Sequence, residues 1–405
     1  MLEHLIPARR HFSEGDPIFA LHAEALRRKA AGEDLLDATL GALLDDDGAL
    51  VVLESVQALW RELTAAEVAP YAPIAGDPGF LRALTQRHWP KLEACGPGCA
   101  TPGGSGALAL SVRNLLEPGM AVLTAEPCWG PYAVLAEENG ASLAFAPFPG
   151  PGQPLDLAAW ERAASALMDR QHRLLVWLNE PCHNPTGLSL AAADRAALLD
   201  LLRRLADQGP VTLLLDCAYP DYTTDPQHVR AALDQYGELG QEGRVLVGAC
   251  LSLSKALTLY GSRGGALVFP WCRDAALQAA LVTSCRGLYS TCPRAPQALL
   301  LRLERDGKRQ EQLCAEHRHW SEVLECRALA LDRAFRAEGL APVAWMGGFF
   351  VTLPLADPAR AFQGLKARGV FTVPLPQGLR VGICGLPAAG APRFAKAMKA
   401  ISINP

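Results

Sequence analysis

The sequence predicts an α/β fold built on a mostly parallel sheet with helices on both faces. Between about residues 95 and 270, short apolar runs alternate with amphipathic stretches of helical period. The apolar runs lack polar–apolar alternation, which is typical of strands buried on both faces. Strands that alternate with helices form βαβ units, and these units produce parallel sheets.

Six apolar runs are the expected strands, at 120–125 (MAVLTA), 142–146 (SLAFA), 173–178 (RLLVWL), 211–216 (VTLLLD), 244–250 (RVLVGAC) and 264–269 (GGALVF). Helical patterns separate them at 104–116, 129–139 and 190–208. A further helix is expected over 17–31, directly after Asp16. It would begin with Pro17, and proline is favoured in a first helical turn. Residues 307–339 predict a long, charged amphipathic helix.

The two ends of the chain are expected to meet in a smaller α/β domain. Residues 1–50 would form an N-terminal arm and part of this small domain, and residues 306–405 its C-terminal part. Residues 51–305 would form the large domain that carries the ligand. A chain of 405 residues is long enough for two or three such units.

Composition excludes several classes of protein. A net charge of −4 argues against a general nucleic-acid-binding surface. No apolar run reaches the roughly 18 residues that span a membrane, and no secretory signal is present, so we expect a cytoplasmic protein. The 12 cysteines are scattered, and only Cys95 and Cys99 lie close together. We interpret them as reduced thiols rather than metal ligands.

Chemically distinctive segments follow the predicted strands, where ligands bind in open α/β sheets. These segments are "TPGGSGAL" (101–108), "NEPCHNPTG" (179–187), "DCAYPDY" (216–222) and "LSLSKALTLYGSRGG" (251–265). The glycine-rich segment can present backbone N–H groups and the Ser105 hydroxyl to a phosphate. The alternative is a plain loop with Ser105 as helix cap.

Asp216 and Lys255 are the most informative single residues. A buried carboxylate such as Asp216 needs a cationic or donating partner, and Tyr219 nearby would suit an aromatic ligand; a simple helix cap is the alternative. Lys255 follows a core strand, where burial would lower its pKa and make the amine nucleophilic. The alternative for Lys255 is an ordinary lysine that reaches the surface.

Ser252, Ser254 and Arg263 favour the reactive role of Lys255, because together they have the chemistry of a phosphate cradle. A reactive amine, a phosphate site and a carboxylate for a ring nitrogen are the groups that pyridoxal phosphate requires. The sequence therefore indicates this cofactor.

The order of the motifs then indicates a family. The chain resembles the fold-type-I pyridoxal-phosphate aminotransferases, in particular the aspartate/aromatic class I group. The resemblance rests on "DPIFALHAEAL", "LLDDDG", "YAPIAGDPGF" (71–80), "PCWGPY" (127–132), "NPTG", "DCAY", "SLSK" with Arg263, and "GLRVGICGL" (378–386). It implies a seven-stranded, mostly parallel sheet, a homodimer with shared active sites, and transfer of an amino group between an L-amino acid and a 2-oxo acid.

The resemblance also implies residue roles. Lys255 would bind the cofactor covalently and carry the proton that leaves Cα, with Asp216 on the pyridinium nitrogen. Asn184 and Tyr219 would bind the ring hydroxyl, and Trp129 would stack on the ring. The phosphate contacts implied are Gly104, Ser105, Gly106, Ser252, Ser254 and Arg263, with Tyr71 reaching in from the partner subunit. The substrate contacts implied are Arg380 for the α-carboxylate, with Asn184, Trp129 and the backbone near Gly41 beside it.

Arg286 bears on substrate choice. It precedes Tyr289 and Ser290 as an arginine does in aspartate-type enzymes, where it crosses the dimer and binds a side-chain carboxylate. That role would make glutamate/2-oxoglutarate or aspartate/oxaloacetate one substrate pair. The alternatives are that Arg286 lies at the surface or the dimer interface, and that Arg294 has this role.

Departures from the family pattern predict an altered substrate pocket, suited to an aromatic or specialised amino acid. Tyr132 stands where the family often has histidine, and Asp37 where it has asparagine. One interpretation is that Asp37 contacts a polar or cationic substrate.

Two other functions use the same cofactor motifs. One is a pyridoxal-phosphate lyase, cyclase or decarboxylase of the same fold. The other is a regulatory domain that binds the cofactor without turnover, although such regulators carry a basic DNA-binding module and this sequence shows none.

Overall fold

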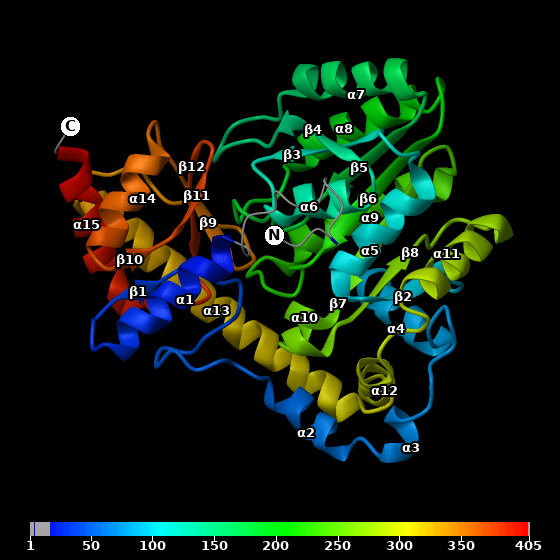
Figure 1. Ribbon diagram of the computed structural model, residues 1–405, viewed down its shortest axis with the longest axis horizontal. Helices are drawn as coiled ribbons and strands as arrows, with labels where there is room; N and C mark the ends of the chain where they lie inside the picture. The colour runs from blue at the N-terminus through cyan, green and yellow to red at the C-terminus, as the bar shows by residue number, and fades with distance from the viewer. Residues whose placement is uncertain (1–3, 5–16, 404–405) are drawn as a thin grey trace.

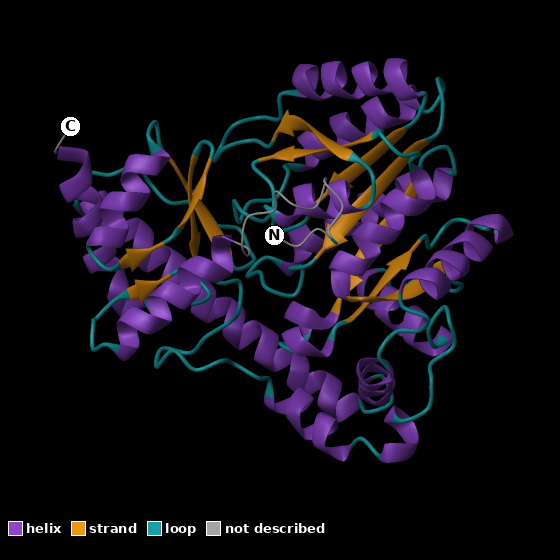
Figure 2. Ribbon diagram, in the orientation of Figure 1, coloured by secondary structure: helices purple, strands orange, loops and turns teal. Residues whose placement is uncertain are grey.

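A seven-stranded sheet forms the centre of the large domain (Figures 1 and 2). The computed structural model describes residue 4 and residues 17–403. In spatial order the strands are β2 (Gly98–Pro102), β8 (Gly264–Val268), β7 (Leu246–Ser252), β6 (Val211–Cys217), β5 (Leu174–Leu178), β3 (Ala121–Glu126) and β4 (Ser142–Pro147). All pairs are parallel except those that β8 makes with β7 and β2. The predicted fold class is confirmed.

Helices cover both faces of this sheet. One face packs against α5 (Gly103–Leu115), α6 (Pro131–Glu138) and α11 (Ala275–Leu288), and the other against α7 (Leu157–Gln171), α8 (Ala192–Leu205) and α9 (Pro226–Glu242). Successive residues of the central strands therefore belong to two separate cores: Leu214 packs in one, and Leu213 and Leu215 pack in the other. Burial of both faces explains why these strands show continuous apolar runs.

The elements differ from the sequence prediction in two places. Strand β2 was not predicted, because its sequence GCATP has no apolar run. Strand β4 was predicted as buried on both faces, but it is the edge of the sheet and is largely exposed, including Phe145. The predicted helices at 104–116, 129–139 and 190–208 correspond to α5, α6 and α8, with ends shifted by a few residues.

The two ends of the chain come together in a second, smaller region. Strand β1 (Leu36–Asp37) pairs in parallel with β10 (Val370–Phe371). Strands β11 (Val373–Leu375), β12 (Gly378–Gly382) and β9 (Phe350–Pro354) form an antiparallel sheet. Helices α1 (Pro17–Ala30), α14 (Pro358–Ala367) and α15 (Ala391–Ile403) pack around them (Figure 1). The predicted domain boundaries after residues 50 and 305 stay predictions.

The long helix α13 (Gly307–Ala337) runs from the large region to the small one (Figure 1). The remaining helices are α2 (Glu54–Glu62), α3 (Ala65–Val68), α4 (Pro78–His88), α10 (Leu253–Ala256) and α12 (Arg294–Leu303). Among the described residues, none of the helices combines the length and the apolar character required to cross a membrane. The 12 cysteines are all free thiols.

A buried ion pair secures the loop that follows β5. Arg195 of α8 lies 3.5 Å from the Glu180 carboxylate, and both side chains are excluded from solvent. The Arg195 guanidinium also donates to the Leu190 carbonyl at 2.7 Å and to the Gln235 side chain at 2.5 Å. Burial raises the pKa of Glu180 to about 7, although Arg195 opposes this effect. The pair thereby ties the loop 179–190 to α8 and α9.

We expect Arg195→Met to destabilise the protein by about 3–5 kcal/mol, because it leaves the Glu180 carboxyl buried without its partner. Urea unfolding would measure this loss. The double variant Glu180→Gln/Arg195→Met should recover part of it, since no isolated charge then remains. The control is Arg204→Ala on the same helix, which breaks an exposed pair with Glu161 and should cost about 1 kcal/mol or less. Equal losses for Arg195→Met and Arg204→Ala would contradict this account.

Candidate active site

A cavity of about 580 Å³ lies at the carboxyl ends of β5, β6 and β7, against the small region. It is the position at which open α/β sheets bind ligands. Most of the predicted site residues line it: Gly41, Gly104, Ser105, Trp129, Asn184, Asp216, Tyr219, Ser252, Ser254, Lys255, Arg263 and Arg380. Residues that lie more than 300 positions apart along the chain therefore share one wall.

Lys255 lies on α10, the single helical turn that follows β7. Burial lowers the pKa of its amine from 10.5 to about 8, and the nearby Arg263 and Arg380 guanidinium groups act in the same direction. Its Nζ lies 4.9 Å from the centre of the Tyr260 ring. With a pKa of about 8, roughly one amine in ten is uncharged at pH 7, whereas an ordinary lysine is almost wholly protonated. The amine is thus suited to act as a nucleophile.

Asp216 ends β6 and is buried. Its Oδ2 accepts a hydrogen bond of 2.7 Å from the hydroxyl of Tyr132. Burial raises the pKa of the Asp216 carboxyl to about 6, while Tyr132 and the positive charge of Lys255 oppose that rise. A carboxylate held this way can pair with a protonated ring nitrogen, because such a partner would remove the cost of burying the charge.

Asn184 and Tyr219 lie together on one side of the cavity. The Asn184 side-chain nitrogen is 3.4 Å from the Tyr219 hydroxyl. The loop is fixed by Asn179, whose side chain accepts from the Asn184 N–H at 2.5 Å and donates to the Asp216 carbonyl at 2.7 Å. The Asn184 side-chain oxygen is buried and has no hydrogen-bond partner among the described residues. Such an atom is expected where a polar ligand binds.

A cradle of hydroxyl groups and one guanidinium forms part of the cavity wall. Arg263 donates to the Ser254 hydroxyl at 3.2 Å and to the Pro102 carbonyl at 3.2 Å. The Ser252 hydroxyl accepts from the Ser254 N–H at 3.2 Å. Helix α5 begins beside them at Gly103, whose φ of +69° and close approach to Arg263 exclude a side chain. These groups are suited to a phosphate.

The glycine-rich segment differs from its prediction in two details. Ser105 is not the helix cap, because α5 begins two residues earlier and Pro102 occupies the cap position. Ser105 therefore lies inside the first turn and lines the cavity. Gly106 does not line it, and a side chain there would collide with Pro102. The lack of a side chain at Gly106 thus allows the close contact between α5 and Pro102.

Arg380 lies on β12 and lines the same cavity as Arg263. Its guanidinium donates to the Thr39 carbonyl at 2.7 Å and lies 4.4 Å from the centre of the Phe350 ring. Gly41 is part of the same wall, because a side chain there would collide with Phe350. A planar cation fixed on two sides in this way can bind a carboxylate in a defined orientation.

Asp37 does not line the cavity. Its Oδ1 accepts from the Thr39 hydroxyl at 2.6 Å, and its Oδ2 lies 2.7 Å from Nδ1 of His22. The interpretation that Asp37 contacts a substrate is therefore wrong for this structure. Asp37 instead shapes the segment whose Thr39 carbonyl holds Arg380.

Besides Gly106, the predicted residues Tyr71, Arg286 and Arg294 also lie outside the cavity of this chain. Tyr71 is 92% exposed. Arg286, at the end of α11, donates to the Ser290 hydroxyl at 2.5 Å. Arg294 forms an ion pair of 2.8 Å with Asp77, which occupies its guanidinium. Tyr71 and Arg286 were expected to act in the site of a partner subunit. Because the structure contains one chain, that role stays a prediction.

The structure adds site residues that the sequence analysis did not assign. Tyr132 was noted only as a departure from a family pattern, yet it holds Asp216. Tyr260 contacts the Lys255 amine and accepts from the Leu43 N–H at 2.9 Å, so it joins the small region to the lysine. Asn179 could have been found, because it directly follows the strand β5. Within residue 4 and residues 17–403, no group of His, Cys, Asp and Glu side chains is arranged to hold a metal ion.

Comparisons with known proteins agree with this geometry. The family model "Aminotransferase class I and II" matches residues 33–398. An aromatic-amino-acid aminotransferase from Pseudomonas aeruginosa is 27% identical, over 95% of this chain and 96% of the relative. The crystal structure of an aminotransferase from Anaerococcus prevotii superposes with a TM-score of 0.90 at 25% identity, over 98% of each chain.

A further solved structure shares the fold. It is an aromatic-amino-acid aminotransferase from Burkholderia pseudomallei covalently bound to pyridoxal phosphate, with a TM-score of 0.80 at 20% identity, over 97% of this chain and 98% of that one. The resemblance drawn from the motifs is confirmed. The family match spans both the large region and the small one, so the chain belongs to the aminotransferase class I and II family.

Proposed function

We propose that the chain is a pyridoxal-phosphate-dependent aminotransferase that moves an amino group between an L-amino acid and a 2-oxo acid. The observation that carries this proposal is the placement of Lys255, Asp216 and Arg263 in one cavity, with the lysine amine at a pKa of about 8. The family assignment supports the same reaction.

The residues present fit the cofactor. The hydroxyl groups and Arg263 match its phosphate, and the buried Asp216 carboxylate matches its ring nitrogen. The buried Asn184 amide and the Tyr219 hydroxyl could form hydrogen bonds with a ring hydroxyl. The Asn184 oxygen, which has no partner among the described residues, would then lie beside a polar group. Trp129 lines the cavity edge-on to Tyr132, with ring centres 5.7 Å apart. Its indole would pack against the ring.

When bound, pyridoxal phosphate supplies an aldehyde that captures amines and a ring that accepts electrons from a substrate carbanion. The Lys255 amine would receive the proton from the substrate Cα and would deliver it to the aldehyde carbon of the cofactor. A base near neutral pKa suits both directions, and such catalysis contributes about 10²–10⁴-fold. Asp216, held as an anion by Tyr132, would keep the ring nitrogen protonated.

Arg380, which lines the cavity and is not part of the phosphate cradle, would bind the substrate α-carboxylate. Separate contacts to the carboxylate and to the phosphate would orient the substrate so that its Cα–H bond faces Lys255, which would favour proton removal over loss of the carboxylate. This orientation favours transamination over a decarboxylase of the same fold.

The walls of the cavity favour an amino donor with a large apolar side chain, such as an aromatic amino acid. Among the described residues, the charged side chains that line it are Asp216, Lys255, Arg263 and Arg380, and each has a role with the cofactor or the α-carboxylate. The remaining wall is largely apolar and includes Ile18, Phe19, Leu40, Pro131, Val134 and Leu135. The relative from P. aeruginosa is named for aromatic amino acids.

A dicarboxylic acceptor such as 2-oxoglutarate needs a further cation, and Arg286 of the partner subunit is our candidate for it. The exposed Tyr71 would in the same way contact the phosphate in the partner's site. We therefore propose a homodimer with shared active sites. We also propose that the protein is located in the cytoplasm.

We expect Lys255→Ala to abolish the visible absorption of the covalently bound cofactor and to lower kcat/KM by at least about 10²–10⁴-fold, because both the nucleophile and the base are lost. Absorption spectra of the purified variant and steady-state kinetics would measure this. Lys396→Ala, which removes an exposed lysine on α15, is the matched control and should behave as wild type. A visible band that persists in Lys255→Ala would refute the role of this lysine.

We expect phenylalanine or tyrosine to exceed aspartate as amino donor with 2-oxoglutarate by about tenfold or more in kcat/KM, because an aromatic side chain buries much more apolar surface against the apolar wall than the short aspartate side chain does. Arg286→Ala should raise the KM for 2-oxoglutarate while leaving the half-reaction with the aromatic donor unchanged. Arg204→Ala removes the same charge far from the cavity and serves as the control. Aspartate as the better donor, or a KM unaffected by Arg286→Ala, would contradict this assignment.

A further inference from the structure

The helical turn that carries Lys255 is too short to satisfy its own backbone. Helix α10 has four residues, and the last carbonyl groups of a helix have no partner within it. The chain turns sharply just beyond, where Thr258 adopts a φ of +49° that is unusual for a β-branched residue. The Lys255 carbonyl accepts a backbone hydrogen bond from the Thr258 N–H at 3.0 Å, just beyond the helix. Further donors to the carbonyl groups of Lys255 and Ala256 come from side chains outside the helix.

Two buried side chains from different elements supply these donors. The hydroxyl of Tyr222, in the loop after β6, donates to the Lys255 carbonyl at 3.0 Å. Nε2 of His317, on α13, lies 2.7 Å from the Ala256 carbonyl. A carbonyl can only accept, so His317 must carry its proton on Nε2. Neither Tyr222 nor His317 lines the cavity, so both contact the lysine turn through its backbone and not through the amine.

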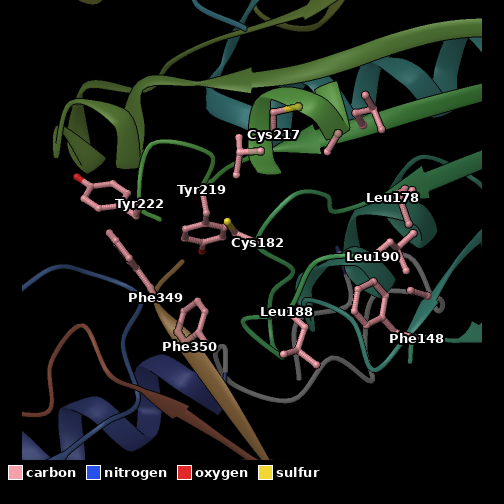
Figure 3. Packing of buried hydrophobic residues seen from close by; sticks show 14 of the residues in the cluster. Phe148, Leu178, Cys182, Leu188, Leu190, Cys217, Tyr219, Tyr222, Phe349 and Phe350 are labelled. Atoms are coloured by element: carbon pink, nitrogen blue, oxygen red, sulfur yellow. The ribbon is translucent and has the colours of Figure 1, made fainter. Parts of the chain in front are cut away.

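The surroundings of His317 keep this arrangement in place. Its ring packs edge-on against Tyr222 with centres 5.5 Å apart, and Tyr222 packs in the same way against Phe349 at 4.8 Å (Figure 3). Nδ1 of His317 lies 3.8 Å from the Asp221 carboxylate, which is itself 3.4 Å from the Arg87 guanidinium. Burial lowers the pKa of His317, so the ring is neutral at pH 7 and donates through Nε2 alone.

We propose that Tyr222 and His317 are positioning residues that hold the backbone of Lys255 and thereby aim its amine into the cavity. The segment 216–222 then has two tasks, because Asp216 and Tyr219 line the cavity and Tyr222 holds the backbone of Lys255. The relative position of carboxylate and amine is set by one short stretch of chain together with α13. The inference rests on the proposed function only where it concerns turnover.

This role has a measurable consequence for the lysine itself. The low pKa of the Lys255 amine arises mainly from burial. Without the two side-chain donors, the Lys255 carbonyl keeps only its hydrogen bond from the Thr258 N–H, and the Ala256 carbonyl loses its donor from His317. This loss favours a rearranged, more hydrated turn. The amine would then be better solvated and its pKa would rise toward 10.5.

The test compares Tyr222→Phe, His317→Leu and His317→Gln with wild type. The pH dependence of Lys255 labelling by an amine-reactive reagent, followed on its peptide by mass spectrometry in cofactor-free protein, reports the pKa of the amine. We expect Tyr222→Phe and His317→Leu to raise it from about 8 to about 9 or above, and to lower kcat/KM of the holoenzyme by up to about 100-fold. His317→Gln keeps an N–H donor and should stay near wild type.

Leu324→Ala is the matched control, because it removes a buried side chain two turns along the same helix without touching either hydrogen bond. It should lower the thermal midpoint while leaving the labelling pKa unchanged. The proposal is overturned if Tyr222→Phe and His317→Leu leave the labelling pKa at the wild-type value, or if Leu324→Ala moves it equally. Failure of the wild-type protein to transaminate would instead refute the proposed function, since the labelling result is independent of turnover.

Discussion

The buried amine of Lys255 is the constraint on which the rest of the site depends. Strands β6 and β7 are neighbours, with Asp216 paired to Cys250, so the carboxylate and the lysine five residues further on emerge at the same edge of the sheet. Removing a positive charge from water in this position costs free energy, and this cost lowers the pKa of the Lys255 amine to about 8. The nucleophile is therefore a product of sheet geometry and burial rather than of lysine alone.

The two arginines of the cavity come from different regions of the fold. Arg263 belongs to the large region, whereas Arg380 comes from β12 and is held by the carbonyl of Thr39 near the N-terminus. The pairing of β1 with β10 brings those two segments together. A ligand with an anionic group at each end fits between the arginines, and the apolar wall leaves room for a side chain without charge.

Much of this could be predicted from the sequence, because the central strands are continuous apolar runs and polar residues follow them directly. Residues such as Asp216, Asn184 and Lys255 stand in such positions and meet in one cavity. Strand β2 escaped prediction because it has no apolar run. Contacts that join distant elements also escaped it: the hydrogen bond from Tyr132 to Asp216 and that between His317 and Ala256 depend on packing, which local pattern does not encode.

The central claim is tested most directly by reducing the holoprotein with borohydride and locating the cofactor by peptide mass spectrometry. The account predicts the mass of the reduced cofactor on the peptide that contains Lys255, with none on the peptides of the other lysines. Attachment of the cofactor to a different lysine would contradict the account. So would a protein that is purified with pyridoxal phosphate but carries the cofactor on no lysine after reduction.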